Sequence, residues 1–128
     1  MQNFSVITKA AIEDLTNARI NKKEIISIII DLKSLGSVLK NEEILKLKLE
    51  MNYKKVYELI NKLKKPSKLK IESVDKEWRI INILGELGLI LRNFIKAIGK
   101  NNNLINIYGI LMEFLSEDRK LYRLIKNI

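Results

Sequence analysis

The stretch from Ile25 to Lys65 reads IISIIIDLKSLGSVLKNEEILKLKLEMNYKKVYELINKLKK, and it decides the predicted fold. Its opening residues are apolar nearly all round, which is typical of a buried helix. Asn21 stands at the N-cap position of this helix, with Glu24 three residues on as in a capping box. The sequence therefore predicts a core helix from Asn21 to about Ser34, then a break at 35–37 and a very short strand at Val38–Leu39.

Two short helices with basic faces are predicted next. The first spans 42–49 with Asn41 as its N-cap, and the second spans 53–65 and ends before Pro66. Between them, Glu50–Asn52 is expected to form a tight turn. The second helix has apolar residues at i, i+3, i+4 and i+7, so we expect it to be buried on one side and basic on the other.

After Pro66, apolar residues no longer recur at helical spacing but alternate with charged ones. Leu69 and Ile71 alternate with the charged residues Lys70 and Glu72, and Trp78 and Ile80 alternate with Glu77 and Arg79. This alternation predicts a β-hairpin over 69–81 with its tip near 74–76. It also makes Trp78 a predicted core residue.

Helices are expected on both sides of this region as well. Apolar residues recur at helical spacing over 5–20, over 84–98 and from about Asn103 to the end of the chain, with a stop at Gly99. The predicted fold class is mainly α with a small β-hairpin. In this prediction residues 1–128 form one domain, with a winged helix-turn-helix core at 22–82 and flanking helices at 1–20 and 83–128.

The composition excludes most catalytic chemistry. The 128 residues include no His and no Cys, so the chain lacks an imidazole base, a thiolate nucleophile and the usual zinc ligands. The adjacent acids Glu42 and Glu43 are explained by a favourable position in the first turn of a helix. We expect no enzymatic activity, no metal and no cofactor.

No targeting or membrane segment is expected. The N-terminal residues lack the pattern of a secretory signal, and the most apolar runs are too short or too interrupted to cross a bilayer. These patterns predict a cytoplasmic protein that does not enter a membrane.

Positive charge is concentrated in one part of the chain. The 24 Lys and Arg residues outnumber the 15 Asp and Glu residues, which gives a net charge of +9. Between Lys46 and Lys70, nine lysines are opposed only by Glu50 and Glu58, a local excess of +7 in 25 residues. Such clustering marks a polyanion-binding surface more often than a solvated helix face. Double-stranded DNA is therefore the expected partner.

The order of predicted elements resembles the core of small winged-helix transcriptional regulators, MarR-like, ArsR-like or of related archaeal groups. Met51-Asn52-Tyr53 matches the turn of that pattern, and Val56-Tyr57 with Leu59 and Leu63 matches its recognition helix. The stretch LKIESVDKEWRIINILGELGLIL resembles the wing and its exit. The resemblance covers about residues 24–92 and implies a DNA-binding regulator. Two departures are Glu50 where the family has glycine, and acids within the wing.

The predicted helix 53–65 has the composition of a helix that enters the major groove, because a helix packed by one face and basic on the other can reach base edges. The residues expected to face DNA are Asn52, Tyr53, Lys54, Lys55, Tyr57, Glu58, Asn61 and Lys62. Residues expected to contact the DNA backbone, from the helices or from the wing, are Lys46, Lys48, Lys65, Lys68, Lys70, Lys76 and Arg79.

Several of these residues have a second interpretation. Tyr57 is explained equally well by packing against the hairpin. Glu58 is in position to pair with Lys54 or Lys62 one turn away, and Asn52 is in position to cap a helix.

The C-terminal helix carries apolar residues on more than one face. One stripe suffices to cover the chain's own core, which leaves another for a partner. This predicts a two-fold homodimer through the N- and C-terminal helices, with two recognition helices about one DNA turn (~34 Å) apart. The expected interface residues are Leu104, Tyr108, Leu111, Leu115, Tyr122 and Ile125. The alternative is a monomer with a thick helical cap.

The function expected from these patterns is a dimeric transcriptional regulator that binds double-stranded DNA, reading the major groove with helix 53–65 and the backbone with a wing near 74–76. Two other interpretations stay open. One is a winged-helix or helical adaptor that binds DNA without sequence preference or assembles with partner proteins. The other is an all-helical basic subunit of an RNA-binding nucleoprotein complex, in which 69–81 is loop or helix.

Overall fold

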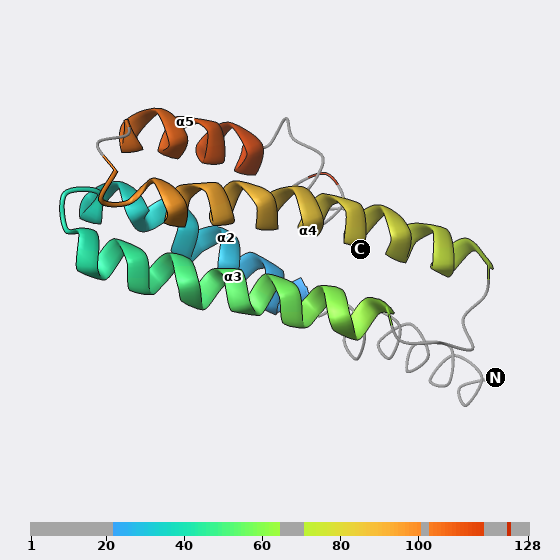
Figure 1. Ribbon diagram of the computed structural model, residues 1–128. Coiled ribbons are helices and arrows are strands. Elements are labelled where there is room, and N and C mark those ends of the chain that lie inside the picture. Colours follow the sequence, from blue (N-terminus) through green and yellow to red (C-terminus); the bar gives the residue numbers. More distant parts are fainter. Residues whose placement is uncertain (1–21, 65–70, 101–102, 117–122, 124–128) are drawn as a thin grey trace.

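The computed structural model of the chain describes residues 22–64, 71–100, 103–116 and 123, and the expected helix over 5–20 lies outside them. The described residues form helices throughout (Figure 1). These are the α-helices α2 (Lys22–Lys33), α3 (Glu42–Lys64), α4 (Ile71–Ala97) and α5 (Leu104–Leu115), and the short 3-10 helix η2 (Ser34–Val38).

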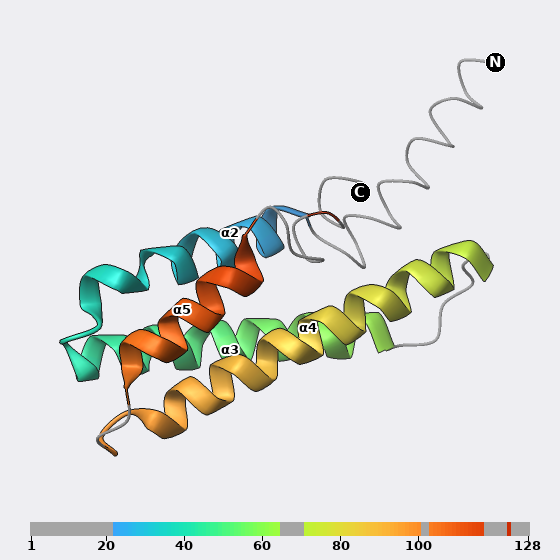
Figure 2. The same ribbon diagram turned by 90° about the horizontal axis from the view of Figure 1, so that it is seen from above.

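The centre of the fold is the antiparallel pair of long helices α3 and α4, which make the most extensive contact in the chain. Helix α2 packs along α3, and α5 packs on α4 and also reaches α2. Figure 2 shows α5 running over the space between α2 and α4. The apolar core lies between the four helices, and no described helix is both long enough and apolar enough to cross a membrane.

Helix α3 is continuous from Glu42 to Lys64, so the predicted turn at Glu50–Asn52 is wrong. The reason is the spacing of its buried residues, which alternates between three and four across the supposed turn. The 23 residues also contain neither Gly nor Pro. The buried residues are Leu45, Leu49, Asn52, Val56, Leu59, Ile60 and Leu63. The predicted helices 42–49 and 53–65 are therefore one rod about 34 Å long, and there is no helix-turn-helix.

The predicted β-hairpin over 69–81 is also wrong, because α4 begins at Ile71 and runs through this segment to Ala97. Ile71, Val74, Trp78 and Ile81 are spaced i, i+3, i+7 and i+10, so the same apolar residues that suggest a strand also fit a helix. The supposed wing tip at 74–76 lies within the helix and contains no Gly or Pro to turn the chain.

The fold class is corrected accordingly: the described residues are all-helical, with no strand and no winged-helix core at 22–82. Val38 ends the 3-10 helix η2 where a short strand was predicted. Trp78 is 54% exposed and not a core residue. The predicted helices at 21–34 and at 84–98 do occur, as α2 and the second half of α4. The helix predicted from about Asn103 to the end of the chain begins as expected, but α5 ends at Leu115 with Ser116 as its C-cap, and most of the later residues lie outside the described ones.

The predicted helix boundaries are confirmed at three polar or glycine positions. The side chain of Asn41 accepts a hydrogen bond from the Ile44 N–H at 3.2 Å, as an N-cap does. Asn103 caps α5 in the same way. Gly99 follows the end of α4 with φ at +78°, the left-handed conformation that glycine adopts most easily.

Tyr108 links helix α5 to the C-terminal end of α2. Its hydroxyl donates a hydrogen bond to the carbonyl of Lys33 at 3.0 Å. The ring end lies so close to Gly36 that a Cβ there would be 2.8 Å from the Tyr108 hydroxyl oxygen. A glycine in η2 is thus what allows α5 to reach α2.

Asn52 links α2 to α3 at the one polar position in the buried face of α3. Its Nδ2 donates to Asp31 Oδ2 at 2.6 Å and to the Lys48 carbonyl at 2.8 Å, and the side chain is fully buried. Lys48 adds an ion pair, with its Nζ 3.9 Å from Asp31 Oδ1. The link fixes the register of α2 on α3.

We predict that Asn52→Ala lowers the free energy of unfolding by about 1–3 kcal/mol, because Asp31 loses a charge-assisted hydrogen bond. Asn52→Asp should cost more at neutral pH, since it sets two carboxylates against each other. Repulsion raises the pKa of this pair, so the extra loss should shrink as the pH falls toward about 4. Urea unfolding of both variants at neutral pH and at about pH 4 measures these losses. An Asn52→Ala protein as stable as the parent would contradict the prediction.

Candidate nucleic-acid interface

The residues expected to face DNA do not share one surface in the folded chain. Asn52 is buried and bonded to Asp31, so it is not available to a base. Tyr53 and Tyr57 lie on the side of α3 that meets α4. The remaining residues are at least partly exposed on the outer and α2 sides of α3, and they are Lys54, Lys55, Glu58, Asn61 and Lys62.

The residues expected to contact the DNA backbone are also dispersed. Lys46 is exposed, whereas Lys48 is half-buried against Asp31. Arg79 is exposed on α4, and Lys76 lies in the first turns of the same helix. Lys65, Lys68 and Lys70 fall outside the described residues.

Tyr53 and Tyr57 form an aromatic pair at the seam between α3 and α4. Their ring centroids are 4.7 Å apart and their planes are tilted by 47°. Tyr57 lies against Gly88 of α4, where a Cβ would be 3.1 Å from its Cε2. The glycine therefore lets a tyrosine ring lie flat in the seam.

The cations Arg92 and Lys96 lie beside this pair. A hydrogen bond with Tyr57 raises the pKa of Tyr53 above the usual tyrosine value, with a smaller contribution from desolvation, whereas Arg92 and Lys96 act to lower it. Arg92 and Lys96 are four and eight residues after Gly88, so they lie on the side of α4 that carries the contact with Tyr57. They are one turn apart on α4 and both are exposed.

Helical spacing extends this cationic surface along α3. Lys46 is seven residues before Tyr53 and Lys64 seven residues after Tyr57, so both lie on the tyrosine side of the helix. Glu50 is an acidic residue within the same stripe. We call this surface the basic face, and it consists of Lys46, Tyr53, Tyr57, Lys64, Arg92 and Lys96.

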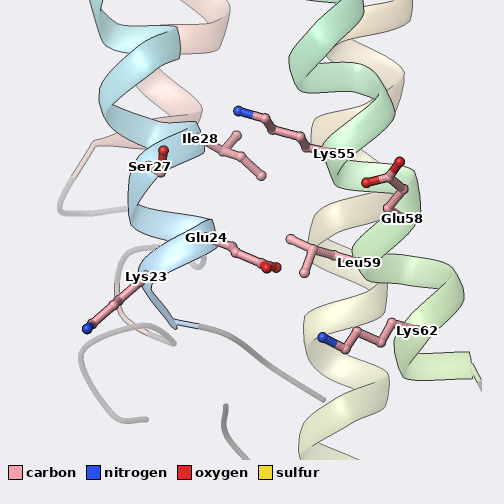
Figure 3. Close-up of a pocket in the computed structure, with 8 residues that line it drawn as sticks. All are labelled: Lys23, Glu24, Ser27, Ile28, Lys55, Glu58, Leu59 and Lys62. Carbon is pink, nitrogen blue, oxygen red and sulfur yellow. The ribbon is translucent and has the colours of Figure 1, made fainter. Parts of the chain in front are cut away.

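A groove of about 470 Å³ lies on the opposite side of α3, between α3 and α2 (Figure 3). Lys55 and Lys62 extend from α3 toward α2, and the carboxylate of Glu24 points from α2 toward α3. The lining side chains are Lys23, Glu24, Ser27, Ile28, Lys55, Glu58, Leu59 and Lys62. Acids and bases alternate here, so the groove is less suited to a polyanion than the basic face.

Four of the six expected dimer-interface residues make contacts inside the chain. Leu111 and Leu115 are fully buried in the core, and Leu104 and Tyr108 are half-buried against it. Tyr122 and Ile125 lie outside the described residues. Helix α5 instead exposes Ile105 and Ile110. The homodimer itself stays a prediction.

No protein-family model matches the chain, and no curated protein or solved structure is significantly similar to it. Within the described residues there is also no group of three or more acidic side chains that could hold a metal ion. What the protein binds must therefore be inferred from its surfaces. Arg92 and Lys96 were not among the predicted site residues, although their i, i+4 spacing in the sequence was a signal of a cationic helix edge.

The seam between α3 and α4 offers a matched pair of glycines for a stability test. We predict that Gly85→Ala raises the free energy of unfolding by about 0.5–1 kcal/mol, because alanine favours the helix and nothing lies within 4 Å of the new Cβ. Gly88→Ala should stabilise less, or destabilise, because Tyr57 has to move. Chemical denaturation of both variants measures the difference, and equal gains would contradict the close approach of Tyr57.

The hydrogen bond between the tyrosines predicts a change in titration. In Tyr57→Phe the pKa of Tyr53 should fall toward about 10, since the bond that favours its neutral form is lost. In the parent protein the raised pKa means that this stabilisation is complete below about pH 10 and is lost at higher pH. NMR titration of ¹³C-labelled tyrosine checks this, with Tyr108→Phe as the control that should leave Tyr53 unchanged.

Proposed function

We propose that the protein binds double-stranded DNA along the basic face, through contacts to the phosphate backbone. The observation that carries this proposal is the position of Arg92 and Lys96 beside Tyr53, with Lys46 and Lys64 extending the same side of α3. Four cations with one acid, Glu50, among them form the kind of surface that attracts a polyanion. Tyrosine hydroxyl groups also contact phosphates in protein–DNA complexes.

Reading of bases by helix insertion is not part of the proposal. Helix α3 is flanked by α2 on one side and by α4 on the other, so only its outer edge is free. That edge carries Lys54 and Asn61, but its other residues, Glu43, Leu47, Met51 and Glu58, are acidic or apolar and outnumber the single cation. An edge of this kind does not suit the floor of the major groove.

Two features favour a duplex over a single strand. The rings of Tyr53 and Tyr57 lie against each other, and Tyr57 also lies against Gly88, which leaves them less able to stack on unpaired bases. Lys46 and Lys64 are also 18 residues apart on one rigid helix, or about 27 Å. That length spans about eight base-pair steps of B-DNA, at about 3.4 Å per step. The proposed role is a small helical protein that coats or bridges DNA with little sequence preference.

The test uses fluorescence anisotropy with a labelled duplex of about 30 base pairs at several salt concentrations. We predict that Arg92→Gln with Lys96→Gln weakens binding by on the order of tenfold per lost contact at about 0.1 M salt. The slope of log affinity against log salt should become shallower by about 2, and the loss should be similar for unrelated duplex sequences.

The matched control is Lys55→Gln with Lys62→Gln, which removes the same charge from the same fold on the α2 side of α3. It should retain most of the affinity. Loss of binding in the control but not in the Arg92 and Lys96 variant would move the contact to the α2 side and contradict the proposed face. Tighter binding of a single strand of the same length would contradict the choice of duplex.

A further inference from the structure

The outer edge of α3 carries exposed apolar residues that the DNA-binding proposal does not use. Ile44, Leu47 and Met51 are spaced i, i+3 and i+7, so they form a stripe, and Leu47 is 59% exposed. On the neighbouring helix α2, Ile26 and Ile30 are exposed as well, Ile30 by 64%. We call these five residues the apolar face.

The apolar face is hollowed and continuous between the two helices. A groove of about 590 Å³ is lined by Ile26 and Ile30 of α2 together with Met51 of α3. Single apolar residues on a surface are ordinary, but a contiguous patch on two packed helices is typical of an interaction site. A helix laid into this groove would cover Ile26, Ile30 and Met51, and Leu47 and Ile44 lie beside the groove on the same stripe as Met51. The other lining residues are polar or charged, namely Lys23, Ser27, Asp31, Ser34 and Lys55.

We propose that the occupant is a second copy of this chain, docked with its α3 antiparallel to the first α3 across a two-fold axis. The charges at the two ends of the stripe support this arrangement. Glu43 precedes the stripe and Lys54 follows it, and both side chains are exposed. They are eleven residues apart, about three turns, and so they lie on the same flank of α3.

An antiparallel partner brings opposite charges together on this flank. With the axis near the middle of the stripe, Glu43 meets Lys54 of the partner subunit, and Leu47 packs against Met51 of the partner subunit. By symmetry the pair forms twice. A parallel partner would instead set this flank against the opposite flank of the partner helix, so that Glu43 and Lys54 would not meet each other's copies.

The two charges are not paired within the chain as far as it is described. Lys48, which is also on α3, pairs with Asp31 and not with Glu43. The basic face lies on the α4 side of α3, away from the apolar face, so docking leaves it uncovered. The proposed dimer therefore goes beyond DNA binding and stands independently of it.

The first experiment is sedimentation equilibrium of the full chain without DNA at micromolar concentrations. The parent protein should be a dimer. Leu47→Glu with Met51→Glu should be a folded monomer by circular dichroism, because it puts four acids into the apolar contact. The control Ile105→Glu with Ile110→Glu changes two equally exposed apolar residues of α5 and should stay dimeric.

The second experiment tests the orientation by charge reversal at low salt. Glu43→Lys and Lys54→Glu should each raise the dimer dissociation constant by about tenfold, since each turns two attractive pairs into repulsive ones. The double variant should restore the parent value. Glu42→Lys is the control for the loss of an acid from the first turn of α3, because Glu42 points about 100° away from Glu43, and it should leave the dimer unchanged.

Three results would overturn the proposal. A parent protein that is monomeric at about 100 μM has no such interface of useful strength. Dissociation of the α5 control instead of the α3 variant would place the interface on α5. Failure of the double charge reversal to restore association would exclude the antiparallel pairing.

Discussion

The continuous buried face of α3 is the constraint on which the rest of the structure depends. Its buried residues recur every three or four positions from Leu45 to Leu63, so the chain keeps one helical axis for 23 residues. Helix α4 packs along one side of this rod and α2 along the other. Every surface of the protein is then defined by its position around α3: the α4 seam, the outer edge and the α2 groove.

Asn52 shows how one polar residue can fix the relation between two helices. In an apolar face it has to find partners, and it does so in Asp31 of α2 and in the carbonyl of Lys48 one turn back. A shift of α2 by one residue along α3 would move the half-exposed carboxylate of Asp31 away from the buried amide of Asn52 and leave that amide with one partner fewer. The hydrogen bond therefore selects one register from several that the apolar contacts alone would tolerate.

The geometry also separates charge from apolar surface. The cations of the basic face lie beside the tyrosines at the α4 seam, and the exposed apolar residues lie on the outer edge and on α2. Because the two surfaces lie on different sides of the same helix, a protein that binds DNA by one and itself by the other would hold two DNA-binding faces on one rigid body. Such a dimer would join two duplex segments without recognising the sequence of either one, as the adaptor interpretation requires.

The sequence by itself determined the helices whose apolar period and boundary residues agree. Helix α2, the second half of α4 and the start of α5 were predicted, and so were the start of α3 after Asn41, the end of α4 before Gly99 and the start of α5 after Asn103, because caps and stops act locally. The charge excess and the lack of His and Cys were also plain from the composition.

Only the tertiary structure decided the segments 50–52 and 69–81. Ile71, Trp78 and Ile80 fit a strand by their alternation, and Ile71 and Trp78 fit a helix equally well, so the choice depended on packing. The long face of α3 supplied that packing and made a helical partner more favourable than a hairpin. The same packing decided the candidate site. Asn52 faces the core and the tyrosines face α4. Arg92 and Lys96 lie beside the tyrosines, although no spacing in the sequence connects their helix to α3.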